Sequence, residues 1–189
     1  MFSPEQQRSL LGLARQAITT ALTTRQLLKL TEVEEAFQMP LGAFVTLTQG
    51  GNLRGCIGYP EPVYPLYETI IRGGISAATQ DPRFMPVTLP ELETVSIEIS
   101  VLSPLAPILP EAVEVGKHGL VIEKGNARGL LLPQVPVEWG WDRLEYLGHL
   151  CRKAGLPADA WRQGATLSSF TAEVFSEHEL LPVSETAVE

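Results

Sequence analysis

Apolar and polar residues alternate most regularly between residues 95 and 102. In that stretch three apolar side chains interleave with three polar ones, which are Ile97, Ile99 and Val101 against Ser96, Glu98 and Ser100. Successive side chains of a strand point to opposite faces, so this alternation predicts a half-exposed strand in an antiparallel sheet.

Helical spacing of apolar residues predicts two helices in the first half of the chain. Ser3 is a suitable N-cap, Pro4 suits the first helical position, and Gln6 can reach back to the cap. We expect this helix to pack one face on a sheet and to fade in the threonine-rich stretch 19–24. Residues 65–80 predict the second helix, which the following Asp-Pro pair should end.

Residues 42–58 predict a β-hairpin, because two strand-like runs flank a pair of glycines that suits a two-residue turn. Val45 would face Cys56 in that register. Leu47 would face Arg54. One additional loop residue would shift every pair, so this register depends on the length of the turn.

The second half of the chain predicts a further hairpin and a helix. Residues 120–132 form two strand-like runs joined by Gly-Asn, and residues 133–136 are expected to be a loop. Residues 142–154 predict a helix closed by a glycine. Residues 170–175 predict a last strand, and the polar tail after residue 182 is expected to fray.

The predicted strands and helices do not alternate in repeating βαβ units. This order predicts an α+β fold with an antiparallel sheet flanked by helices. A chain of 189 residues suits one domain, or two small lobes that share a core. We expect a single domain over residues 1–189, ordered over about residues 5–182.

Composition and charge narrow the classes of function. The net charge is −8 and the 14 basic residues form no run that could follow a phosphate backbone, so nucleic-acid binding is disfavoured. We find no apolar segment long enough to span a membrane and no signal-peptide pattern, and the cytoplasm is the expected location. Cys56 and Cys151 should stay reduced there. The cysteines and histidines show no metal-ligand spacing, so neither a metal nor a cofactor is predicted.

Several sequence segments occur together in a fixed order between about residues 40 and 175. They are LRGCIGYPEPVYPL, AATQDPRF, IEISVL, VGKHGLVIEKG, LLPQV and CRKAGLPADAW. This set resembles the AMMECR family, in particular the bacterial and archaeal members called AmmeMemoRadiSam system protein A. The resemblance implies a two-lobed α+β domain, and we place a shared cleft near the LRGCIG hairpin. It also implies a pathway shared with a Memo-like protein and a radical SAM protein as partners, but no particular reaction.

The LRGCIG segment holds the first candidates for chemistry. Side chains at i and i+2 of a strand share a face, so Arg54 and Cys56 should project together, and a nearby positive charge favours the thiolate form. The alternative is that Cys56 is a small buried hydrophobic residue packed near Val45. Gly55 and Gly58 flank the thiol, which lets either a ligand or another backbone approach closely.

Four further residues are candidates for binding, proton transfer or ion pairing. Arg83 with Arg54 would make a two-arginine anion site, while Asp81 could either line it or pair with Arg83. His118 lies between glycines, where it could carry a proton or be an exposed turn residue. Glu98 is a candidate cross-strand partner of Arg54.

The remaining polar and aromatic candidates are expected to be structural. Cys151 should pack in the core on a stripe with Leu144 and Leu147, whereas His149 lies off that stripe. His149 could then be exposed or could reach the site from the other lobe. The three tryptophans are expected to be packing anchors, and they are Trp139, Trp141 and Trp161.

Two functional hypotheses follow from these candidates. The first is a cysteine-dependent enzyme or enzyme component that acts on a small anionic or modified substrate. The second is a non-catalytic module that binds the pathway partners. The chain lacks the P-loop, GxGxxG, GxSxG, HExxH and CxxxCxxC patterns, so phosphoryl transfer and radical SAM chemistry in this chain itself are disfavoured.

Overall fold

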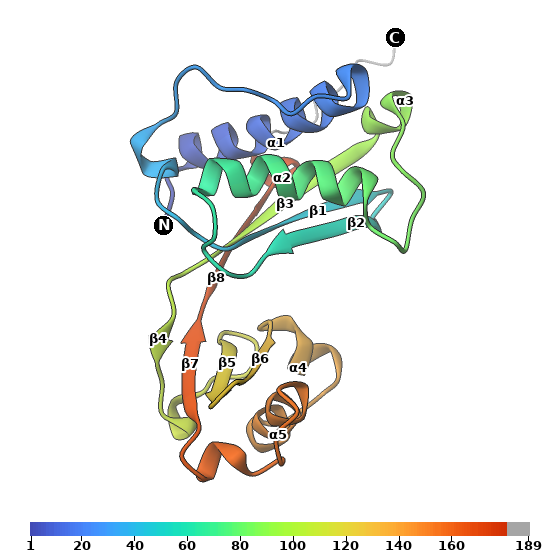
Figure 1. Ribbon diagram of the computed structural model, residues 1–189. Coiled ribbons are helices and arrows are strands. Elements are labelled where there is room, and N and C mark those ends of the chain that lie inside the picture. The colour runs from blue at the N-terminus through green and yellow to red at the C-terminus, as the bar shows by residue number, and fades with distance from the viewer. Residues whose placement is uncertain (181–189) are drawn as a thin grey trace. The chain divides into compact units, whose positions relative to one another are not determined.

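The computed structural model describes residues 1–180, and the chain divides into two compact units. Unit 1 contains residues 1–102 together with the segment from residue 173 onward, and unit 2 contains residues 103–172. Each unit holds one four-stranded antiparallel sheet with helices (Figure 1), which confirms the predicted α+β class. The predicted fraying after residue 182 lies outside the described residues.

Unit 1 is built on a sheet with the strand order β2-β1-β3-β8. The strands are β1 (Ala43–Gln49), β2 (Asn52–Tyr59), β3 (Val95–Leu102) and β8 (Ala172–Ser176). The helices are α1 (Pro4–Thr24), η1 (Glu35–Phe37), α2 (Leu66–Thr79), α3 (Leu89–Leu92) and α6 (Glu177–Leu180). Because β2 pairs only with β1, it is an edge strand, and this places the LRGCIG segment at the border of the sheet.

The core of unit 1 lies between the sheet and the two long helices. Apolar side chains from both layers are fully or almost fully buried, including Leu11 and Ile18 of α1, Ile70 of α2, Val45 of β1 and Ile97 of β3. Ile97 therefore points into the core as the alternation of β3 predicts, and its polar neighbours on the strand are half-buried on the opposite face. The half-exposed antiparallel strand is confirmed.

Helix α1 begins and ends where the sequence predicts. The Ser3 hydroxyl accepts a hydrogen bond from the Gln6 backbone amide, and the Gln6 side-chain oxygen accepts one from the Ser3 backbone amide. These two bonds form a complete capping box. The helix ends at Thr24, the last residue of the threonine-rich stretch. The hydroxyls of Thr19 and Thr23 donate to carbonyls one turn earlier, so these side chains are satisfied within the helix.

The β1–β2 hairpin forms around the two glycines, but its register differs from the prediction. The turn glycines have φ values of 56° and 79°, and pairing begins normally with Thr48 opposite Leu53. A β-bulge follows, so Leu47 pairs with Gly55 and Arg54 is the extra residue. The predicted pairings of Val45 with Cys56 and of Leu47 with Arg54 are therefore wrong by one residue.

Unit 2 contains the second sheet, with the strand order β4-β7-β5-β6. Its strands are β4 (Ala106–Pro107), β5 (Gly119–Lys124), β6 (Ala127–Leu131) and β7 (Thr166–Phe170). Its helical elements are η2 (Pro110–Ala112), α4 (Gln134–Glu138), α5 (Arg143–Lys153) and η3 (Ala160–Arg162). The core forms where α5 packs on the sheet, and it includes Tyr146, Leu150 and Ile122.

The predicted elements of unit 2 are confirmed in part. The β5–β6 hairpin is present, and α5 starts at a capping box on Asp142 and is followed by Gly155 with a φ of 73°. The expected loop at residues 133–136 is wrong, because helix α4 begins at Gln134. The single strand expected at residues 170–175 is instead β7 and β8, which belong to different sheets.

None of the helices within residues 1–180 is long and apolar enough to cross a membrane.

Candidate functional site around Cys56

Cys56 lies on the polar face of the unit 1 sheet, opposite the face that α1 and α2 cover. Because of the bulge, its cross-strand neighbour is Thr46 and not Val45, which points into the core. The Thr46 hydroxyl donates to Cys56 Sγ over 3.3 Å. Cys56 itself is half-buried, so it is not a member of the buried core.

Two side chains that follow α2 hold the backbone of Cys56 at the outer edge of β2. Asp81 Oδ2 accepts from the Cys56 amide over 2.8 Å, and Arg83 Nη2 donates to the Cys56 carbonyl over 3.4 Å. We call Asp81 and Arg83 the edge clamp. An edge strand normally leaves such groups open to a further strand, and the clamp closes this one at Cys56.

The edge clamp is itself tightly paired. Asp81 Oδ1 accepts from both the backbone amide and Nε of Arg83, and Oδ2 accepts from Nη2 over 2.7 Å. These bonds, with a further contribution from the Cys56 amide, hold the pKa of Asp81 well below its usual range despite the cost of burial. The Asp81 side chain is 2% exposed, whereas that of Arg83 is 54% exposed. One end of the clamp is therefore buried and the other reaches solvent.

Arg54 is paired with Glu91 of α3, and not with Glu98, the candidate partner on β3. Nε and Nη2 of Arg54 donate to the two Glu91 carboxylate oxygens over 2.5 and 3.1 Å. This pairing lowers the pKa of Glu91. Nη1 of Arg54 is buried and makes no hydrogen bond within residues 1–180. Arg54 thus fixes the bulge to α3.

Phe84 lies near both arginines of the predicted anion site. The Cζ atoms of Arg54 and Arg83 are 5.9 and 5.5 Å from the centre of the Phe84 ring. Each guanidinium is also neutralised by its own carboxylate, Glu91 or Asp81. The structure thus brings Arg54, Arg83 and Asp81 around one segment of β2, but it pairs the charges. Their role in binding an anion stays a prediction.

The glycines beside Cys56 each have a packing reason. A Cβ atom on Gly55 would clash with the carbonyl oxygen of Ala77, where β2 passes close to α2. A Cβ atom on Gly58 would clash with the Phe44 ring and with the Ala43 carbonyl. The sequence leaves two explanations for these glycines, the approach of a ligand and the approach of another backbone segment. The second is observed. Their part in a substrate site stays a prediction.

His118 belongs to unit 2, and its ring takes part in a local turn. Nδ1 accepts from the Glu114 amide over 3.0 Å. This bond explains a polar residue between two glycines without reference to catalysis. His118 and Cys56 belong to different units, and the role of His118 as a proton carrier stays a prediction.

Glu98 is a group whose position sequence reasoning missed. Thr46 pairs with Cys56 on one side and with Glu98 on the other, so the three residues form one row across β2, β1 and β3. Strands lie about 4.8 Å apart, which puts Glu98 about 10 Å from Cys56. Burial raises the pKa of Glu98, with a smaller contribution from Glu179. Only the true register reveals this row.

The sequence predicts that several residues of unit 2 pack in the core. The prediction is confirmed for Cys151 and is wrong for Leu144 and Trp139. Cys151 is fully buried in the core of unit 2, and burial raises the pKa of its thiol. Leu144 is exposed and does not share that buried stripe. Trp139 is 70% exposed, so it is not a packing anchor, although Trp141 and Trp161 pack against the core. No group of three His, Cys, Asp or Glu side chains is placed to hold a metal ion within the described chain.

Comparison with known proteins assigns the chain to a family. Residues 11–175 match the AMMECR1 family. The chain belongs to the AMMECR1 family. A protein from Methanothermobacter thermautotrophicus is 47% identical over 93% of this chain and 96% of its own length. One from Aquifex aeolicus is 44% identical, with 91% and 93% covered. The crystal structure of uncharacterized protein PH0010 from Pyrococcus horikoshii matches with 43% identity, a TM-score of 0.76 and 91% of both chains covered.

Proposed function

We propose that this AMMECR1-family protein is a cysteine-dependent enzyme or enzyme component that acts on a small anionic or modified substrate. The position of Cys56 Sγ carries this proposal. Cys56 is half-buried on the polar face of the sheet, and its sulfur accepts a hydrogen bond from the Thr46 hydroxyl over 3.3 Å. A hydroxyl donor stabilises negative charge on sulfur, and the thiolate is the nucleophilic form of cysteine.

The edge clamp supports the proposal because it fixes the backbone from which the thiol projects. Both the amide and the carbonyl of Cys56 are held, so the thiol has a set direction, as a positioned nucleophile requires. Arg83 is half-exposed, and its Nη1 makes no hydrogen bond within residues 1–180. We assign that nitrogen to the anionic group of the substrate, with Arg54 as the residue that holds the bulge in place.

Proton transfer in this proposal has two candidates. Glu98 shares the cross-strand row with Cys56, and burial raises the pKa of Glu98, which brings a carboxyl group closer to the range useful for proton transfer. His118 is the second candidate, proposed because it is a histidine between glycines at the start of a hairpin. Memo-like and radical SAM proteins in the cytoplasm are the partners that the family resemblance implies.

Differential labelling tests whether the thiol is available. We expect iodoacetamide to modify Cys56 in the native protein well before Cys151, as followed by mass spectrometry, because Cys151 is fully buried. Thr46→Val should slow labelling of Cys56, whereas Thr48→Val on the same strand and face should leave the rate unchanged. Labelling of Cys56 only when the protein unfolds would refute a reactive thiol.

A second candidate is an interaction module that binds the same partners. One observation favours it: the arginines and glycines of the LRGCIG and DPRF segments already have a structural explanation. The arginines are paired with Asp81 and Glu91, and Gly55 is required by the passage of α2. Such a hairpin would be a rigid element of a docking surface and need not bind a substrate.

Cys56→Ser and Arg83→Gln distinguish the two functions. If the protein is an enzyme component, these variants stay folded, bind purified Memo-like and radical SAM proteins normally, and lose the pathway product. If it is an interaction module, binding falls in Arg83→Gln while Cys56→Ser is normal in both assays. Circular dichroism of each variant shows that the fold is retained.

A further inference from the structure

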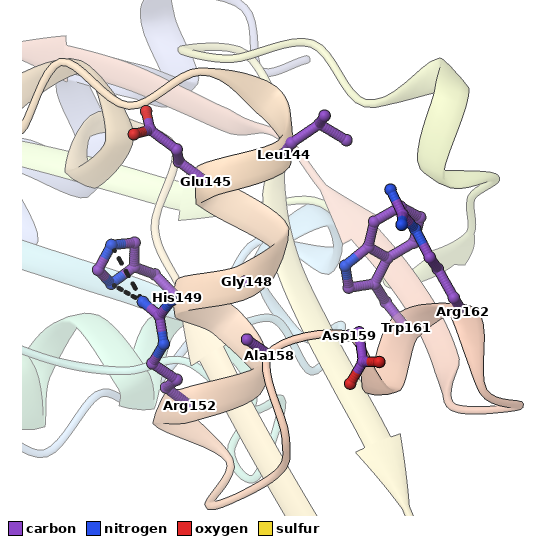
Figure 2. A pocket seen from close by; sticks show the side chains of 9 residues that line it. All are labelled: Leu144, Glu145, Gly148, His149, Arg152, Ala158, Asp159, Trp161 and Arg162. Atoms are coloured by element: carbon purple, nitrogen blue, oxygen red, sulfur yellow. Dashed lines mark hydrogen bonds between the residues drawn. The ribbon is translucent and has the colours of Figure 1, made fainter.

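Unit 2 carries a groove of about 450 Å³ along α5. Its lining comes from α5, from η3 and from the segment that leads into η3, and all of these residues belong to unit 2. Figure 2 shows His149 and Arg152 on one side of Gly148, with Trp161 and Arg162 on the other. The groove does not include Cys56, so an inference about it is independent of the function proposed above.

Two guanidinium groups in this groove lack carboxylate partners. The ion pairs formed within residues 1–180 include neither Arg152 nor Arg162, although the chain has 22 acidic residues against 14 basic ones. The two acidic residues of the groove accept from local donors instead. Glu145 accepts from the Asp142 amide over 2.9 Å, and Asp159 accepts from the Gln163 side chain over 2.7 Å.

Aromatic rings hold both guanidinium groups in place. Nη1 of Arg152 lies 3.2 and 3.3 Å from the two ring nitrogens of His149. Because these distances are nearly equal, this nitrogen lies over the ring and not in line with either lone pair. The other face of the imidazole stacks on Trp141, with centroids 3.7 Å apart and an angle of 2°. Arg162 lies over the Trp161 ring, with Cζ 4.3 Å from its centre.

The floor of the groove between the arginines includes a buried glycine of α5. This glycine is Gly148, where an added Cβ would make only ordinary contacts, the nearest being 3.7 Å from the Ala158 carbonyl oxygen. No side chain therefore rises from α5 between the two arginines at this position. The indole of Trp161 gives the same groove an apolar wall that suits a planar group.

From these contacts we infer that the groove binds a small oxyanion, a phosphate ester or a carboxylate, that carries a planar ring. Planar guanidinium groups match such oxyanions in geometry and charge. Stacking fixes Arg152 and Arg162 before the ligand arrives, which reduces the entropy lost on binding. The oxyanion contacts the two guanidinium groups, and the ring of the ligand packs on Trp161.

Titration of the full chain with three probes tests this inference. The probes are phenyl phosphate, benzoate and inorganic phosphate, followed by calorimetry and by tryptophan fluorescence at constant ionic strength. We expect saturable binding of phenyl phosphate or benzoate with a Kd at or below about 1 mM, and weaker binding of inorganic phosphate. The preferred probe tells whether the natural ligand is a phosphate ester or a carboxylate.

Substitutions locate the site. Arg152→Gln and Arg162→Gln should each weaken binding about tenfold or more. Lys153→Gln removes the same charge from an exposed position of the same helix outside the groove, and it should leave the Kd unchanged within about twofold. Gly148→Met should block the groove while keeping both arginines. Thermal unfolding by circular dichroism checks that each variant is folded.

Three results would overturn the inference. The first is the absence of saturable binding of phenyl phosphate and benzoate up to about 10 mM. The second is that chloride at the same ionic strength changes the calorimetric and fluorescence signals as much as the probes do. The third is that Lys153→Gln loses as much affinity as Arg152→Gln and Arg162→Gln. The last two would mean that the probes respond to net charge and not to this groove.

Discussion

Removal of the buried carboxylate of the edge clamp should loosen β2 at Cys56. Asp81→Asn keeps the shape of the side chain but replaces one acceptor oxygen by an NH2 donor. The Asn side chain can therefore accept hydrogen bonds at only one of the two positions. The Cys56 amide or the Arg83 guanidinium then loses its partner. The side chain at residue 81 is 2% exposed, so water does not readily replace the lost acceptor.

The magnitude follows from the kinds of bonds lost. A hydrogen bond to a charged group contributes about 1.5–3 kcal/mol. The ion pair adds little beyond this, about 0–1 kcal/mol, because Arg83 is half-exposed and solvent screens it. We therefore expect Asp81→Asn to lower the free energy of unfolding of unit 1 by about 2–4 kcal/mol, a large share of the usual 5–15 kcal/mol.

Hydrogen exchange read by mass spectrometry measures the effect locally. The peptide that contains Cys56 should lose protection in Asp81→Asn, while peptides from the β5–β6 hairpin of unit 2 serve as an internal control. Urea unfolding followed by circular dichroism gives the global change. Asp142→Asn is the matched control, because Asn and Asp are equally good N-caps and the cap of α5 should survive.

The effect should also depend on pH with a definite sign. The pKa of Asp81 is lower in the folded protein than its ordinary value of 3.8. A carboxyl whose pKa is lower in the folded protein stabilises the fold at any pH above its pKa in the unfolded chain. This contribution is lost as the pH falls below about 4. The difference between wild type and Asp81→Asn should shrink in that range. The reasoning would be refuted if Asp81→Asn lowered the free energy of unfolding by less than about 1 kcal/mol. It would also be refuted if the difference in stability between wild type and Asp81→Asn were the same at pH 2 as at pH 7.

Three further substitutions test other contacts of unit 1. Gly55→Ala should destabilise the fold by about 1–3 kcal/mol, measured by thermal unfolding, because the added methyl meets the carbonyl of Ala77. Glu91→Gln should cost about 1–3 kcal/mol, since it leaves Arg54 without an anionic partner while one of its nitrogens is buried. Burial raises the pKa of Glu98, so the contribution of Glu98 to native stability is greatest while its carboxyl is protonated and falls as the pH rises past its unfolded pKa. Glu98→Gln should therefore raise the melting temperature more at pH 7 than at pH 4, and an equal rise at both would contradict this.

The elements that could be predicted from the sequence are those whose causes are local. The capping box of Ser3 and Gln6 and the two glycines of the first turn lie within a few residues of the structure they produce. The alternation of β3 is likewise contained within eight residues. These signals fix where an element begins, turns or ends, and they need no knowledge of the rest of the fold.

The register of β2 could not be predicted, because its cause lies elsewhere in the chain. Gly55 must face the backbone of α2 at Ala77, where no side chain fits, and the bulge at Arg54 brings it there. Arg54 is in turn held by Glu91, which is 37 residues away. A two-residue turn alone predicts the regular pairing. The Thr-x-x-Glu pattern ending at Glu91 could have indicated a helix start, but not the partner of Arg54.

One register shift therefore determines what kind of residue Cys56 is. In the regular register it would lie opposite Val45, a core residue, and would be explained as a small buried side chain. In the observed register its neighbour is Thr46, and Glu98 lies in the same row. The edge clamp then fixes the backbone of Cys56 and leaves its sulfur on the polar face. Packing alone accounts for Gly55 and for the paired arginines, but it gives no reason for a thiol at this position, and for this reason Cys56 is the residue on which a functional test should begin.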